Sequence, residues 1–167
     1  MLERMIRAAR LSPQLYEEVE ADTGATSQAM MVVVLVAVAT GIGTTGAGGV
    51  VGLFSGIVFG LLSWAVWAYV TYTVGTSLFS TPETNASWGE LARTTGFAQS
   101  PGILRILGFL PAIGPVIYLV ASLWQLVAMV IAVRQALDYR STWRAVAVVI
   151  VGFIVLAIFQ VVLFALL

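Results

Sequence analysis

The sequence predicts an all-α integral membrane protein, a bundle of five transmembrane helices preceded by a short amphipathic helical segment. Of its 167 residues, 60% are apolar and only 10% are charged, whereas soluble domains average about half apolar and about a quarter charged. A chain of 17.8 kDa has too little interior to bury so many apolar residues. The chain has only eight basic and eight acidic residues. The apolar runs between them reach about 20 residues, the length that a membrane helix needs.

Residues 1–27 are expected to form cytosolic or interfacial helices. The first turns place apolar side chains beside basic ones, as in helices that lie on a membrane surface: Leu2, Met5, Ile6 and Ala9 against Arg4, Arg7 and Arg10. Ser12 followed by Pro13 predicts the start of a second short helix. The acidic residues Glu17, Glu18, Glu20 and Asp22 separate the basic residues from the first apolar run, which argues against a secretory signal.

Residues 28–167 are expected to form the membrane domain. The charge-free run 23–82 can hold two spans, and the glycine-dense stretch 41–49 is expected to divide them. Pro111 and the Gly114–Pro115 pair predict a tight turn between the third and fourth spans. The five spans are expected at about 28–42, 50–79, 91–110, 116–133 and 145–167.

The third stretch, 91–110, could either cross the membrane or lie in its interface. Basic residues concentrate in cytosolic loops, and they occur here both in the N-terminal segment and in the connector between the last two spans, at Arg134, Arg140 and Arg144. Both groups lie on the same side only if 91–110 crosses. The sequence therefore predicts five spans, with the N-terminus cytoplasmic and the C-terminus outside.

Several function classes are excluded by composition. The chain has no His, Cys or Lys, so it lacks the residues for a His or Cys metal site, a catalytic triad, a disulfide or a Schiff base. The zero net charge argues against nucleic acid as a partner. Gly41, Gly43 and Gly46 match G-x-G-x-x-G, but they follow a predicted membrane helix rather than a strand, so no cofactor is expected.

A glycine stripe in the second span is the first candidate interaction site. Gly48, Gly52, Gly56 and Gly60 recur every four residues, a spacing that lets another helix approach closely. The stripe is expected either to pack within the monomer or to contact a second copy or another membrane protein.

Three intramembrane polar residues form the second candidate. Arg105 is the one charge well inside a predicted span, while Gln125 and Gln160 are single polar residues in the fourth and fifth. Arg105 either reaches the headgroups with its long side chain or contacts an ion, lipid or substrate. The glutamines are expected to form hydrogen bonds between helices.

Three segments together resemble the Yip family, five-span membrane proteins named for interaction with Ypt/Rab GTPases. They are LSPQLYEEVEADTGATSQAM before the first span, TGFAQSP in the third, and LWQLVAMVIAVRQALDYRSTWRAVAVV from the fourth into the fifth. The resemblance implies functional positions at Gly96, Phe97, Ala98 and Pro101. Physically, Gly96 would permit close backbone approach, and Pro101 would kink or start a helix.

Eukaryotic members of that family act in vesicle traffic and carry a longer cytosolic N-terminal domain. This chain is more similar to the compact prokaryotic members, which implies the plasma membrane of a prokaryote, and GTPase binding is not part of the expectation. We expect a non-enzymatic scaffold, organiser or accessory subunit that contacts membrane proteins, lipid or a second copy through helix faces and cytosolic loops. The alternative is a small transporter or channel with a polar path at Arg105, Gln125 and Gln160.

Overall fold

The computed structural model describes residues 1–44 and 49–166, with side chains of the last helix described as far as Ile158 and at Val161. Every regular element within these residues is helical, which confirms the all-α class. The elements are α1 (Leu2–Ala9), α2 (Pro13–Ala21), α3 (Ala25–Gly43), α4 (Gly49–Ser77), α5 (Trp88–Ala98), the 3₁₀ helix η1 (Ser100–Phe109), α6 (Gly114–Ala136) and α7 (Thr142–Leu166).

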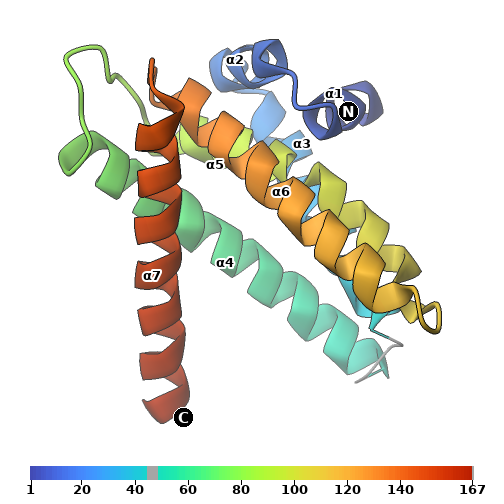
Figure 1. Cartoon of the computed structure of the whole chain (residues 1–167). Coiled ribbons are helices and arrows are strands. Elements are labelled where there is room, and N and C mark those ends of the chain that lie inside the picture. Colours follow the sequence, from blue (N-terminus) through green and yellow to red (C-terminus); the bar gives the residue numbers. More distant parts are fainter. Residues whose placement is uncertain (45–48, 167) are drawn as a thin grey trace.

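The long helices run back and forth, and α1 and α2 cover one end of the bundle (Figure 1). The beginning of α3 and the connector between α6 and α7 lie at that same end, whereas the C-terminus of α7 lies at the other. α7 leans across α4 and packs on both α4 and α6. Within the described residues, α3, α4 and α6 are long and apolar enough to cross a membrane, and Thr142–Ile158 of α7 is apolar but shorter.

α3 continues to Gly43 and α4 begins at Gly49, so both ends of the stretch 41–49 that was expected to divide two spans are helical. Its central residues 45–48 lie outside the described residues. A Cβ atom at Gly41 would lie 3.3 Å from Leu53 Cδ1, and one at Gly43 would collide with the backbone carbonyl of Arg105. These glycines are therefore tightly packed helical positions. Tertiary contact outweighs their low intrinsic helix propensity.

The third predicted span is a composite of α5 and η1 rather than one regular helix. α5 starts with a capping box, in which the Glu90 amide donates to Ser87 Oγ (3.3 Å) and the Ser87 amide donates to Glu90 Oε2 (2.6 Å). It ends just before Pro101, whose missing N–H cannot continue an α-helical ladder. The 11 residues of α5 and the 10 of η1 rise by about 36 Å together, from 1.5 and 2.0 Å per residue.

The centre of the bundle is α5, against which α2, α3, α4 and α6 all pack. Every residue from Leu91 to Ala98 is buried. η1 continues from α5 and lies between α3 and α6. The α5 half of the third stretch is thus buried, whereas Ile106, Leu107 and Phe109 in the second half of η1 are exposed.

Candidate functional site

The TGFAQSP segment lies in the core and shapes it. A Cβ atom at Gly96 would lie 2.8 Å from the Cβ of Ala29, so α5 and α3 touch at backbone distance. Phe97 and Ala98 are fully buried, and Pro101 stands in the first turn of η1. The structure places these four positions in helix packing and presents none of them to the surface.

Arg93 is a buried arginine whose role was not recognised in the sequence. Only 7% of it is exposed. Its Nε donates to the carbonyl oxygen of Val19 (2.9 Å), and its Nη2 donates to that of Glu20. The end of α2 is thereby fastened to the centre of the bundle.

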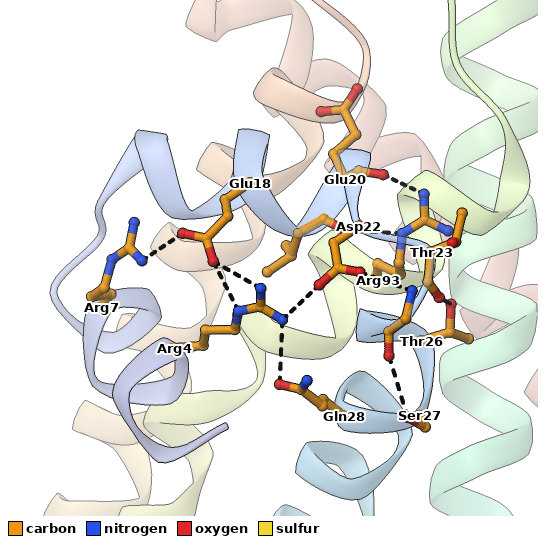
Figure 2. A network of polar contacts seen from close by, with 12 residues as sticks. Arg4, Arg7, Glu18, Glu20, Asp22, Thr23, Thr26, Ser27, Gln28 and Arg93 are labelled. Atoms are coloured by element: carbon orange, nitrogen blue, oxygen red, sulfur yellow. Dashed lines mark hydrogen bonds and ion pairs between the residues drawn. The ribbon is translucent and has the colours of Figure 1, made fainter.

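The N-terminal helices are held by a network of ion pairs (Figure 2). Arg4 lies between Glu18 (2.9 Å) and Asp22 (3.0 Å), and Arg7 pairs with the other oxygen of Glu18 (2.6 Å). Arg7 and Arg4 lower the pKa of Glu18, and the hydrogen bond from Arg4 lowers that of Asp22. Arg4 also donates to Gln28 at the start of α3 (3.4 Å).

The amphipathic α1 packs on the bundle with only part of the face that the sequence indicated. Met5 and Ala8 are buried, whereas Leu2 and Ile6 are exposed by 68% and 45%. Trp124 of α6 donates from Nε1 to the carbonyl of Ala9 (2.7 Å). The helix is therefore attached to α6 along one side and leaves apolar side chains on the other.

A cavity of about 600 Å³ lies beside this network, where α2, α5 and the α6–α7 connector meet. Its lining includes Glu17, Glu20, Glu90 and Asp138. Burial, followed by the charges of Asp138, Glu90 and Glu17 and opposed by that of Arg93, raises the pKa of Glu20 to about 7. Among the described residues no group of three or more His, Cys, Asp or Glu is arranged to hold a metal ion.

A second cavity is a groove of about 630 Å³ between α3 and the first half of α4. The glycine stripe lines it with Gly52, Gly56 and Gly60, and Gly49 joins them; Gly48 lies outside the described residues. A Cβ atom at Gly60 would touch Ala37 at 3.4 Å, while one at Gly56 would meet nothing within 4 Å. The stripe thus packs within the monomer at one end and borders an open groove along the rest.

Arg105 and Gln125 come together around Gly102. A Cβ atom at Gly102 would lie 2.9 Å from Gln125 Oε1 and 3.6 Å from Arg105 Nη1. Arg105 Nη2 donates to Ser122 Oγ (3.1 Å), and its guanidinium lies 5.0 Å from the centre of the Tyr118 ring. Arg105 Nε and Gln125 Oε1 are buried and have no hydrogen-bond partner among the described residues.

Gln160 stands on α7, and its side chain lies outside the described residues. α7 packs on α4 and α6, whereas Arg105 is on η1 between α3 and α6. Two of the three residues of the suggested polar path are therefore brought together.

The connector arginines bind backbone and loop atoms at the end of the bundle that α2 covers. Arg134 donates from Nε to the carbonyl of Tyr139 (3.2 Å), which holds the connector against the end of α6. Arg140 pairs with Glu83 (3.3 Å), and Arg144 donates to the carbonyl of Phe79 (3.4 Å). They fasten the α6–α7 connector to the α4–α5 loop.

Comparison with known protein families gives a match over most of the chain. The sequence model of the Yip1 domain matches residues 12–164, which include α2 and most of the remaining helical chain. No curated protein and no solved structure gives a significant match. Because the match covers nearly the whole chain, this protein belongs to the Yip1 domain family.

Proposed function

We propose that this Yip1-domain membrane protein is a non-enzymatic organiser or accessory subunit that binds membrane proteins or lipid in the α3–α4 groove. The open groove is the observation that supports this proposal. In a bilayer, helices associate through close packing of small residues, because lipid chains are as apolar as side chains. At Gly56 that packing is unused within the monomer, so the surface is available to another membrane component.

The proposal includes five membrane crossings, with the N-terminus cytoplasmic and the C-terminus outside, in a prokaryotic plasma membrane. The segments α3, α4, α5 with η1, α6 and α7 alternate in direction, and the termini lie at opposite ends of the bundle (Figure 1). The N-terminal ion-pair network and the arginines of the connector lie at one end, as the concentration of basic residues on the cytosolic side requires. That end would present the cytosolic contacts of the protein.

Site-specific photocrosslinking in native membranes tests whether the groove is occupied. A benzoylphenylalanine introduced in place of Leu53 lies in the lining of the groove, while the same group at Val51, 80% exposed, lies on the same helix outside it. We expect a discrete crosslinked product, either protein or lipid, from position 53 and a weaker, diffuse pattern from Val51. Identical patterns from the two positions would contradict a binding role for the groove.

A second tagged copy in the same cells tests self-association at this site. A crosslink from position 53 to the other tag identifies the occupant as a second copy of the chain. A product without that tag identifies another protein or a lipid, and both outcomes remain within the proposed function.

A further inference from the structure

Arg105 carries a positive charge that no acidic residue of the chain neutralises. The sequence has no Asp or Glu between residues 23 and 82, or between Glu90 and Asp138. The ion pairs of the described residues use Arg4, Arg7 and Arg140. An unpaired cation within a membrane span is costly, and such residues mark contacts with charged groups. Its described contacts, Ser122 Oγ and the Tyr118 ring, carry no formal negative charge, so a counter-charge would be supplied by a group from outside the chain.

The position of Arg105 brings it close to the level of lipid headgroups. Its carbonyl oxygen abuts Gly43 at the end of α3, near the point where α4 begins. Four residues of η1 follow it up to Phe109, a rise of about 8 Å at 2.0 Å per residue. A phosphate at the surface of the bilayer is thus within reach of a long arginine side chain.

The groove changes in polarity along its length. Thr40, Thr44 and Arg105 line it near the end of α3, whereas Val33, Phe59 and Gly60 line its deeper part. At Gly56 there is no side chain to fill it. A ligand that fits must carry a negative charge at one end and an apolar chain at the other.

We propose that the α3–α4 groove binds one anionic phospholipid, with its phosphate at Arg105 and an acyl chain along the glycine face of α4. This inference rests on the proposed function and names the ligand class for the same groove. Among membrane components, a phospholipid supplies both the missing counter-charge and the apolar chain. Binding of this lipid also differs from nonspecific contact between Arg105 and headgroups, because the lipid is held in a defined groove.

Lipid retention by the purified protein tests the assignment. The full chain is reconstituted with equal amounts of phosphatidylglycerol and phosphatidylcholine and then extracted in mild detergent. Native mass spectrometry measures which lipid remains bound to the protein. We expect the wild type to retain one phosphatidylglycerol in preference to phosphatidylcholine. Arg105→Gln should reduce that retention at least tenfold, while Arg144→Gln, which removes an exposed arginine, should leave it unchanged.

A second pair of variants tests the site of the acyl chain without altering charge. Gly56→Leu places a side chain in the groove, and Ser55→Leu places one on the exposed outer face of α4. Gly56→Leu should abolish retention, and Ser55→Leu should preserve it. If Arg105→Gln does not give a folded protein, as judged by circular dichroism, this second pair decides.

Equal retention of the two lipids by the wild type would overturn the proposal. So would retention by folded Arg105→Gln or Gly56→Leu at the wild-type level. If the lipid assignment fails, the proposed function still stands provided that the crosslinker at position 53 captures a discrete protein in native membranes. If neither lipid retention nor a discrete crosslink is found, both proposals fall.

Discussion

Arg93 of α5 donates a 2.9 Å hydrogen bond from Nε to the backbone carbonyl of Val19, in the last turn of α2. Its Nη2 donates to the neighbouring carbonyl of Glu20. The last carbonyls of a helix have no partner within it and carry partial negative charge. One buried guanidinium satisfies two of them and joins the N-terminal segment to the central helix.

Replacing Arg93 is expected to destabilise the protein strongly. Arg93→Met removes both hydrogen bonds and leaves carbonyls at the end of α2 without a partner, at a cost of about 3 kcal/mol. Arg93→Lys keeps the charge but loses the planar fork that serves two acceptors, so its loss should be intermediate. Chemical unfolding in detergent micelles measures both. Arg10→Met, at an exposed position, should change stability by less than about 0.5 kcal/mol, and equal stability of the Arg93 and Arg10 variants would contradict the role of Arg93.

Gly96 is predicted to be essential for the contact between α5 and α3. Gly96→Ala puts a methyl group 2.8 Å from the Cβ of Ala29 and should cost about 1–3 kcal/mol through overpacking. Gly56→Ala is the matched control, because its Cβ meets nothing within 4 Å and alanine is the better helix former. The shift in the unfolding midpoint measures the difference.

Adding Ala29→Gly to Gly96→Ala should recover only part of the lost stability. The new Cβ would still lie 3.3 Å from the Cα and carbonyl oxygen of residue 29. A Gly96→Ala variant as stable as Gly56→Ala would show that the two helices can separate without cost.

The helical segments could be predicted from sequence because hydropathy and charge vary over the length of a span. α4 begins at Gly49, one residue before its expected start, and α3 begins at Ala25, three residues before its expected start. The 3₁₀ geometry of η1 was not predicted. Pro101 signals an interruption, but how the chain continues depends on the packing of η1 between α3 and α6.

The contacts of the candidate sites were harder to predict from the sequence than the helices. The acceptors of Arg93 are backbone carbonyls 73 and 74 residues away, and backbone atoms leave no side-chain pattern. The spacing of Gly52, Gly56 and Gly60 predicts a smooth helix face. Whether a neighbouring helix fills that face depends on how α3 and α4 cross, and the structure shows contact at Gly60 and open space at Gly56.

Stability should fall as the pH rises through the titration of Glu20. Burial raises the pKa of Glu20 to about 7 from its ordinary value of 4.5. The native carboxyl therefore holds its proton more tightly than the unfolded chain does, and folding is favoured by protonation. This contribution is fully present below pH 4.5 and is lost as the pH rises to about 7. Asp138, whose pKa is also raised by burial, adds a change of the same sign.

Glu20→Gln should flatten this decline in the free energy of unfolding, measured by denaturant titration between pH 4.5 and 7.5. Glu18→Gln is a control at a carboxyl whose pKa shift has the opposite sign, because Arg7 and Arg4 lower the pKa of Glu18. The Glu18 contribution is present above its unfolded pKa and is lost as the pH falls through the lowered value. A decline that persists unchanged in Glu20→Gln would assign it to another group, such as Asp138.

The five-crossing arrangement predicts opposite accessibility for the two short connections of α6. The chain contains no cysteine, so one introduced thiol can be labelled without a background. Ile113, in the η1–α6 turn, and Ser141, in the α6–α7 connector, are both exposed. In intact cells a membrane-impermeant maleimide should label Ile113→Cys, and Ser141→Cys should react only after permeabilisation. Gln14→Cys on α2 should behave like Ser141→Cys. The reverse pattern at Ile113 and Ser141 would mean that α5 and η1 do not cross the membrane, and the connector arginines would then face outward.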